Sequence, residues 1–287
     1  MNPHLSNPSS IPHTAVFKPG SQEELANAIG ECVQVDNDCA TGPKGPIGSW
    51  DVSGVTAMWL VFDDQKLFNG DISKWDVSKV TSMYSMFKSA QSFNQDISKW
   101  DVSSVTGMHS TFKGALSFNQ DISNWDVSRV VSMYSMFEGA LFFNRDISKW
   151  DVSSVTGMHS MFYSALSFDQ DISQWKVSRV TQMRCMFDRA SSFNQDISQW
   201  DVFSVLNMDL MFHGASSFHQ TLCSAAWRVS KKARTDDMFA DSNGRIGDDN
   251  ACSTTAPPTR FEPIFKHELT NAIGECVTRW DMVSDGS

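Results

Sequence analysis

Basic residues are scarce in this chain of 287 residues: Lys and Arg number 23 against 33 Asp and Glu, which gives a net charge of −10. Nucleic-acid binding relies largely on Lys and Arg, so this balance argues against that class of function. No apolar run approaches the ~20 residues of a membrane-spanning helix. The amino terminus has no basic stretch followed by an apolar one, so we expect no secretory signal there, and residues 1–16 are predicted to be a disordered leader.

Residues that build reactive or metal-binding sites are also sparse. The six cysteines are scattered and form no C-x-x-C pair, so we expect neither a disulfide framework nor a zinc site, although Cys32 and Cys39 could pair in an oxidising compartment. The sequence has no glycine-rich phosphate loop and no H-x-x-x-H pair. Its seven histidines do not recur beside a fixed Ser and Asp, which argues against a catalytic triad. We therefore expect a protein without catalytic residues, cofactors or metal ligands.

Tryptophan, phenylalanine and methionine are abundant, because one phrase recurs every 25 residues. Seven tryptophans keep this spacing: Trp50, Trp75, Trp100, Trp125, Trp150, Trp175 and Trp200. Relative to each Trp, Val recurs at positions +2 and +5, Met at +8, Phe at +12 and +18, and Ile at +22 in most repeats; these offsets name the columns of the array. Such a period predicts a solenoid or array, in which each unit buries its apolar residues against its neighbours.

Each repeat has a predicted local shape. The phrase I-S-x-W-D-V is rich in branched and aromatic residues and predicts a short strand. From V-T-x-M to M-F-x-x-A, apolar residues recur at steps of three and four, which predicts a short helical turn, α or 3₁₀. Stacked repeats of this kind place the Trp column in a continuous core.

Two polar columns repeat as well. Asn at +19 (Asn69, Asn94, Asn119, Asn144 and Asn194) predicts a ladder whose side chains satisfy backbone groups of neighbouring turns. Asp recurs at +1 and at +21, where stacked carboxylates need neutralisation by backbone N–H groups, by Lys or by a cation. Local capping of turns by these Asp side chains is the favoured explanation, and calcium bound between turns is the alternative.

The phrase WDVSxVTxMxxMFxxAxxFNQDIS, which covers residues 50 to about 222, resembles the repeat of the BspA-like leucine-rich-repeat surface proteins, also found in mycoplasma lipoprotein-like sequences. The resemblance implies an α/β repeat fold: a right-handed, leucine-rich-repeat-like solenoid of about seven 25-residue turns, with short strands and short helical turns. For bacterial members it implies adhesion or binding at a host surface, and hence a cell-surface or extracellular location. It carries over no catalytic residues.

The two ends of the array differ from the repeats between them. Residues 17–49 are predicted to form an amino-terminal cap, with a helix that starts at the N-cap Ser21, carries Glu24 in a capping box and buries Leu25, Ala28, Ile29 and Cys32. After the array of 50–222, residues 223–240 look like a degenerate last repeat, and 241–260 like a polar linker. Residues 261–277 restate 17–33, so 261–287 are predicted to be a second cap helix and the start of a truncated second module.

The +9 column is the candidate ligand face. It holds Trp59, Tyr84, His109, Tyr134, His159 and Arg184. Each residue follows an inward-pointing Met, so we expect its side chain to point outward, and aromatic and Arg side chains are enriched at interfaces. The leading hypothesis is a non-enzymatic scaffold, a monomer or part of a larger array, that binds a protein or glycan ligand. The alternatives are a structural spacer of a larger repeat protein and, for the column itself, a packing role.

Overall fold

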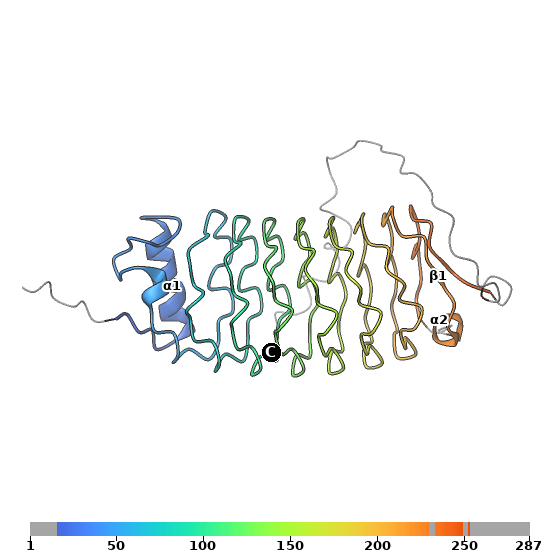
Figure 1. Ribbon diagram of the computed structural model, residues 1–287, viewed down its shortest axis with the longest axis horizontal. Helices are drawn as coiled ribbons and strands as arrows, with labels where there is room; N and C mark the ends of the chain where they lie inside the picture. The colour runs from blue at the N-terminus through green and yellow to red at the C-terminus, as the bar shows by residue number, and fades with distance from the viewer. Residues whose placement is uncertain (1–15, 230–232, 249–251, 253–287) are drawn as a thin grey trace, which may run out of the picture.

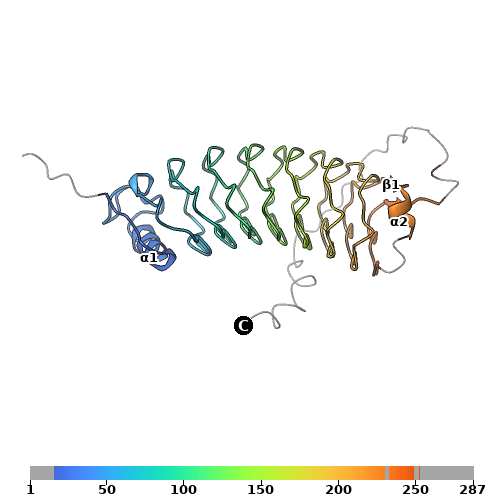
Figure 2. The same ribbon diagram turned by 90° about the horizontal axis from the view of Figure 1, so that it is seen from below.

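The computed structural model describes residues 16–229, 233–248 and 252 (Figure 1). Its regular elements are α1 (Gln22–Val33), a 3₁₀ turn at Ile47–Ser49, β1 (Thr221–Leu222), α2 (Ala225–Val229) and β2 (Arg245–Ile246). Between these ends the chain winds through successive turns that lie side by side, as the two views of Figures 1 and 2 agree. No helix in the described part is both long and apolar enough to cross a bilayer.

Neighbouring turns are joined by parallel bridges at the +7 column. The bridges link Ala57, Ser82, Gly107, Ser132, Gly157, Gln182, Asn207 and finally Arg234 in one continuous series. From +8 to +14 the backbone makes a ladder in which all bonds between turns run in one direction. In each of the seven turns that begin at Trp50 to Trp200, the four N–H groups at +8, +10, +12 and +14 donate to carbonyls of the following turn, at N···O distances of 2.6–3.2 Å. The stack is therefore held by main-chain bonds as well as by apolar packing.

This ladder explains why the elements within the repeats differ from those predicted. The phrase I-S-x-W-D-V forms turns rather than a strand, and the segment predicted as helical forms a chain of separate turns. In one repeat these turns close with bonds from Met86 to Met83, from Lys88 to Ser85 and from Ala90 to Phe87. Ser85 and Ser89 have positive φ angles of 52° and 58°, which break helical continuity. A helix would keep every N–H within its own turn, whereas here alternate N–H groups reach the neighbouring turn.

The core consists of columns of identical side chains. All seven repeat Trp are at most 4% exposed, and the Phe rings at +12 are fully buried. Successive +12 rings stack with centroids 5.2–5.7 Å apart, and each also contacts the +18 ring of its own turn. The Trp indoles are hydrogen-bonded too: Nε1 of Trp125 donates to the carbonyl of Ile97 at 3.1 Å, and the repeats from Trp75 to Trp200 share this bond, whereas Trp50 donates to Gly45. The prediction that the Trp column is core is confirmed.

The predicted Asn ladder is confirmed in atomic detail. Oδ1 of each Asn at +19 accepts the backbone N–H of the same position in the next turn, at 2.8–3.2 Å. Asp169 replaces Asn at one step and still accepts the N–H of Asn194 at 2.8 Å. At the amino-terminal end, Asp38 provides the same bond to the N–H of Asn69. A single amide oxygen per turn thus satisfies a backbone donor that would otherwise be unpaired.

The helix α1 caps the first turn much as the sequence predicts. Ser21 is the N-cap and accepts the N–H of Glu24, while the Glu24 carboxylate accepts from Gly20 rather than from Ser21 itself. The buried residues of the helix are those predicted: Leu25, Ala28, Ile29 and Cys32. Nε2 of Gln22 donates to the carbonyl of Trp59 at 2.8 Å, which ties the helix to the first repeat. A disulfide joins Cys32 to Cys39.

The carboxyl-terminal end extends further than predicted. Trp227, in α2, donates to the carbonyl of Ile197, and Phe239 stacks on Phe212 at 5.4 Å, so the degenerate repeat forms an eighth turn. The prediction of a linker from residue 241 is wrong for 241–248, because β2 in this segment pairs in parallel with β1. The expectation of no disulfide framework also needs correction, since a second disulfide joins Cys223 to Cys252. The predicted leader and the restated cap at 261–287 lie outside the described residues.

Candidate ligand-binding face

The +9 column forms one continuous stack of rings along the array. The ring centroids of Trp59 and Tyr84 are 5.6 Å apart, with an interplanar angle of 1°. The next steps, to His109, Tyr134 and His159, are 4.8, 4.5 and 4.6 Å. Each side chain lies between the buried Met at +8 and a residue at +10 with positive φ, which turns the backbone back toward the core. The structure thus brings these five predicted residues together, in sequence order.

The rings of the +9 column are neither core nor free-standing. All six positions from Trp59 to Arg184 are half-buried, because each ring covers the faces of its neighbours. What they present to solvent is a row of ring edges. At +7, two residues earlier, the same five turns carry Ala57, Ser82, Gly107, Ser132 and Gly157, which are all small. A Cβ placed on Gly157 would meet no atom within 4 Å, so open space lies beside the row.

The histidines of this face are held in the neutral form. Burial lowers the pKa of His109. Burial also lowers the pKa of His159, to about 4, and the positive charges of Arg184 and Lys113 act in the same direction. A neutral imidazole offers one donor and one acceptor, so at neutral pH the stack is an uncharged face with polar edges. Arg184 adds a positive charge at one end of it.

The stack ends where the column changes chemistry. Asp209, the next residue at +9, is buried and accepts both the backbone N–H of Asp236 at 2.9 Å and the guanidinium of Arg234 at 2.9 Å. Its carboxylate is therefore committed to holding the seventh and eighth turns together. Arg234 also pairs with Asp236 at 3.2 Å.

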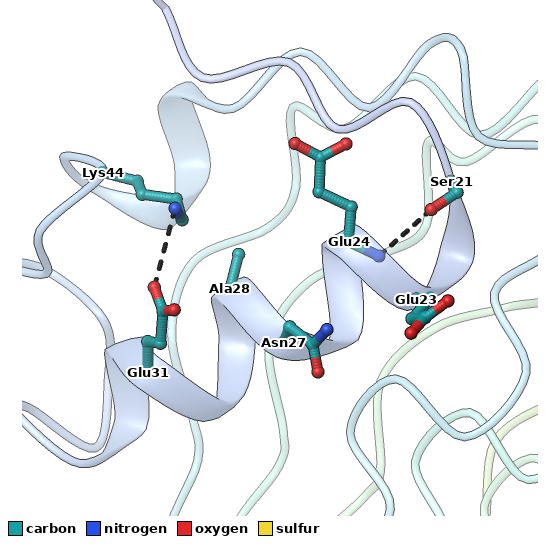
Figure 3. A pocket seen from close by; sticks show the side chains of 7 residues that line it. All are labelled: Ser21, Glu23, Glu24, Asn27, Ala28, Glu31 and Lys44. Carbon is teal, nitrogen blue, oxygen red and sulfur yellow. Dashed lines mark hydrogen bonds and ion pairs between the residues drawn. The ribbon is translucent and has the colours of Figure 1, made fainter.

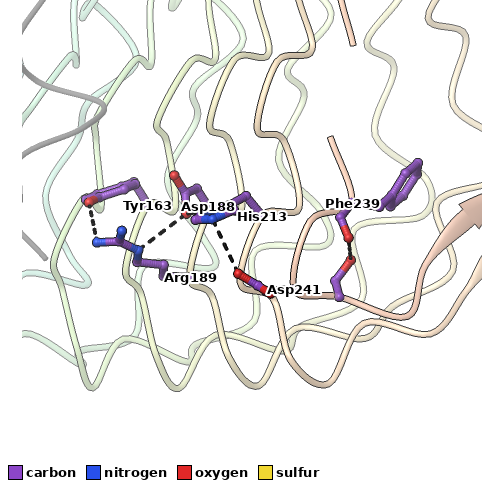
Figure 4. A network of polar contacts seen from close by, with 7 residues as sticks. Tyr163, Asp188, Arg189, His213, Phe239 and Asp241 are labelled. Atoms are coloured by element: carbon purple, nitrogen blue, oxygen red, sulfur yellow. Dashed lines mark hydrogen bonds and ion pairs between the residues drawn. The ribbon is translucent and has the colours of Figure 1, made fainter. Parts of the chain in front are cut away.

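A polar network across four turns was not predicted from the sequence. Nδ1 of His213 lies 2.8 Å from Oδ1 of Asp188, whose side chain is nearly buried, and Nε2 of His213 lies 3.8 Å from Asp241 (Figure 4). Arg189 contacts both Asp188 and the hydroxyl of Tyr163. Burial raises the pKa of the Asp188 carboxyl, and the hydrogen bond to His213 opposes that rise. Tyr163, Asp188 and His213 all occupy the +13 column. Because the three residues differ in type, the repeat pattern in the sequence did not show that they lie side by side.

The two Asp columns cap turns within their own repeats. In each column Oδ1 accepts the backbone N–H of the Ser two residues later, at 2.9–3.1 Å, as for Asp76 with Ser78 and Asp96 with Ser98; Asp201 accepts from Phe203 instead, at 3.3 Å. These hydrogen bonds lower the pKa of most of these carboxyls; for Asp51, where the bond to Lys18 contributes most, the pKa falls to about 2. Within the described ranges, no three His, Cys, Asp or Glu side chains come together as a metal site.

The outer side of α1 carries a shallow hollow of acidic character (Figure 3). Its lining includes Glu23, Glu24 and Glu31, and Lys44 neutralises part of this charge by pairing with Glu31 at 3.5 Å. The ammonium of Lys44 also lies 4.9 Å from the ring centroid of Phe17. These contacts hold the loop after α1 against the helix, and we assign this structural role to the hollow.

The bridged turns and the stacked columns define a repeat protein. The chain belongs to the family described as Mycoplasma protein of unknown function, DUF285, whose model matches it twice in tandem, at residues 32–148 and 141–248. The two matches together span the end of α1 and the loop after it, the repeat array and the eighth turn. No match was found among curated proteins or among solved structures.

Proposed function

We propose that the repeat array is a right-handed, leucine-rich-repeat-like solenoid that acts as a non-enzymatic binding scaffold of adhesion type. Its ligand is an extended protein segment or glycan that lies along the +9 column from Trp59 to Arg184. The observation that carries the proposal is the continuous ring stack, with steps of 4.5–5.6 Å. Rings locked in this way present contact area at little further entropic cost, which favours binding.

The geometry favours a ligand that forms hydrogen bonds over one that stacks. Within the stack, both faces of His109 and of Tyr134 are covered by neighbouring rings, so a sugar ring or an aromatic side chain cannot lie flat on them. The edges of the rings remain accessible to a ligand, and the neutral imidazoles of His109 and His159 place polar groups at regular intervals along them. An extended polypeptide, whose N–H and C=O groups recur along its length, suits such a row better than a compact ligand.

A role without catalysis agrees with the arrangement of the titratable groups. His109 and His159 are separated by Tyr134, with a ring-stacking contact on each side, so they do not converge on one reacting atom. Catalytic constellations need such convergence within hydrogen-bonding distance. Repeated geometry spreads equivalent groups along a line, which suits a scaffold for an elongated ligand.

The test uses a fourfold variant of the +9 column with a matched control. The variant changes Tyr84, His109, Tyr134 and His159 to Ser; the control changes the exposed residues Lys99, Asn124, Lys149 and Gln174 to Ser in the same four repeats. The whole chain is screened against displayed peptide libraries and a glycan array, and each hit is titrated by calorimetry. We expect saturable binding that the control keeps and the variant loses, with the fold retained in both by circular dichroism.

Two outcomes would contradict the proposal. If no peptide or glycan binds saturably, the chain is better explained as a structural spacer. If a ligand binds equally to the folded fourfold variant, the ligand face lies elsewhere and the ring stack serves packing alone.

A further inference from the structure

The carboxyl-terminal end of the array leaves its main-chain ladder open. In every turn from Trp50 to Trp200, N–H groups at +8, +10, +12 and +14 donate to the next turn. The bridge from Asn207 to Arg234 and the bonds of Met208, Leu210, Phe212 and Gly214 fix the register of the eighth turn. Its equivalent donors belong to Thr235, Asp237, Phe239 and Asp241. In the part of the chain that the structure describes, these four N–H groups donate no hydrogen bond.

The same end exposes apolar side chains from columns that are otherwise core. Phe239 continues the +12 stack on Phe212 but is only half-buried, whereas its predecessors are fully buried. Ile246 is 37% exposed, although its partner in the preceding turn, Leu222, is 0% exposed. Phe239 and Ile246 line one open hollow at this end, together with Thr235, Met238, Ala240 and Arg245. Open donors and exposed core residues therefore coincide on one surface.

We propose that this surface docks one further repeat of the same kind, supplied by another repeat-bearing chain. Such a repeat offers the complementary features: carbonyls at +7, +9, +11 and +13 in one row, and a +12 Phe that stacks on Phe239. Each of the seven existing interfaces between turns uses this combination of contacts. The proposal concerns the end of the array and does not depend on the +9 ligand face.

Other occupants fit this surface less well. A second copy docked end to end by the same surface would set donors against donors. The edge of an ordinary strand alternates donors and acceptors, so it needs free carbonyls as well as free N–H groups on its partner. The carbonyls of Thr235, Asp237 and Phe239 already accept bonds inside the eighth turn, so the donors of such a strand would find no free carbonyl there. An anion would face the carboxylates of Asp236, Asp237 and Asp241. The opposite end of the array presents carbonyls, and there α1 covers them, with Gln22 donating to the carbonyl of Trp59.

The test measures amide hydrogen exchange in the full chain with a peptide of residues 156–174, which carries one carbonyl row together with Phe162 and Phe168. We expect exchange at Thr235, Asp237, Phe239 and Asp241 to slow by about tenfold, saturably with peptide concentration. The N–H of Phe212, which is already bonded to the carbonyl of Met238, should not change and serves as the internal reference.

Two controls and a second probe keep the result decisive. A peptide with Phe162→Glu, or a chain with Phe239→Glu whose Phe212 amide remains protected, should show no slowing. The second probe is a chain that lacks residues 1–49, because removal of α1 uncovers the carbonyl row of the first turn. When mixed with the full chain, it should slow the same four amides and form a mixed complex in sedimentation. The proposal is overturned if neither probe slows these amides, or if the Phe239→Glu chain responds as the full chain does.

Discussion

Replacement of Trp125 by Ala tests how the core of the array is held together. The indole is 4% exposed, and its Nε1 donates to the carbonyl of Ile97 at 3.1 Å, so the change removes a large buried side chain and one of the two donors to that carbonyl, which keeps the N–H of Trp100. Large-to-small changes of this kind cost about 3–5 kcal/mol, and the loss of one hydrogen bond adds about 0.5–1.5 kcal/mol. We therefore expect a loss at the upper end of the first range.

The assay is equilibrium unfolding in urea, followed by circular dichroism and by tryptophan fluorescence. Because each turn contacts only its neighbours, a weakened turn in mid-array should separate the unfolding of the two halves into distinct transitions. The matched control is Phe142→Ala in the same repeat, since this ring is 59% exposed and its removal should change stability by no more than about 0.5 kcal/mol. A cost below about 1 kcal/mol for Trp125→Ala would refute the conclusion that the Trp column holds the turns together.

Three further predictions follow from the polar columns. Asn119→Ala removes the acceptor of the Asn144 N–H and should cost about 1–3 kcal/mol, whereas Asn124→Ala at an exposed position should cost under about 0.5 kcal/mol; equal costs in urea unfolding would contradict the ladder. The folded pKa of His159 is lowered from 6.5 to about 4, so the unfolded chain is protonated first, and stability should be constant above pH 6.5 and fall between pH 6.5 and 4. The pKa of Asp51 is lowered from 3.8 to about 2, so its contribution to stability is present above pH 3.8 and is lost only as pH falls from there to 2. In a profile of melting temperature against pH, His159→Tyr should reduce the loss between pH 6.5 and 4 and leave the loss below pH 3.8. An unchanged profile would count against the assignment to His159. Since the Asp columns cap turns through Ser N–H groups, a chelator at constant ionic strength should leave the melting temperature unchanged, and a clear decrease would favour calcium between the turns.

The capping helix was the easiest element to read from the sequence, because its signals are local. The start of the helix is marked by Ser21, with Glu24 three residues later, and the buried side is marked by the apolar stripe from Leu25 to Cys32. The helix α1 spans Gln22–Val33 accordingly. The +9 column was also found from spacing alone, and the structure adds that its rings stack on one another. That these residues bind a ligand stays a prediction.

The features that sequence reading missed depend on residues far apart in the chain. The +13 network joins Tyr163, Asp188 and His213, which share a column but not a chemistry, so no repeated letter marks them. Cys223 and Cys252 form a disulfide although they are 29 residues apart, and no spacing motif in the sequence marks them as a pair. The segment 241–248 has the polar composition of a linker, yet β2 pairs with β1 because the preceding turn offers open hydrogen-bonding groups.

The sequence by itself determined the period, the buried columns and the Asn ladder, because a strict 25-residue repeat forces equivalent residues into equivalent places. Only the tertiary structure decided the backbone conformation inside each repeat. Apolar spacing of three and four predicts a helix, but Ser85, Leu60 and Cys185 at the +10 column all have positive φ, and neither Leu nor Cys favours that conformation alone. The cost is offset because the kinked backbone lets four N–H groups per turn bond to the next turn. A hydrogen bond to a residue 24 positions later exists only once the neighbouring turn is in place, so no local pattern of residues can reveal it.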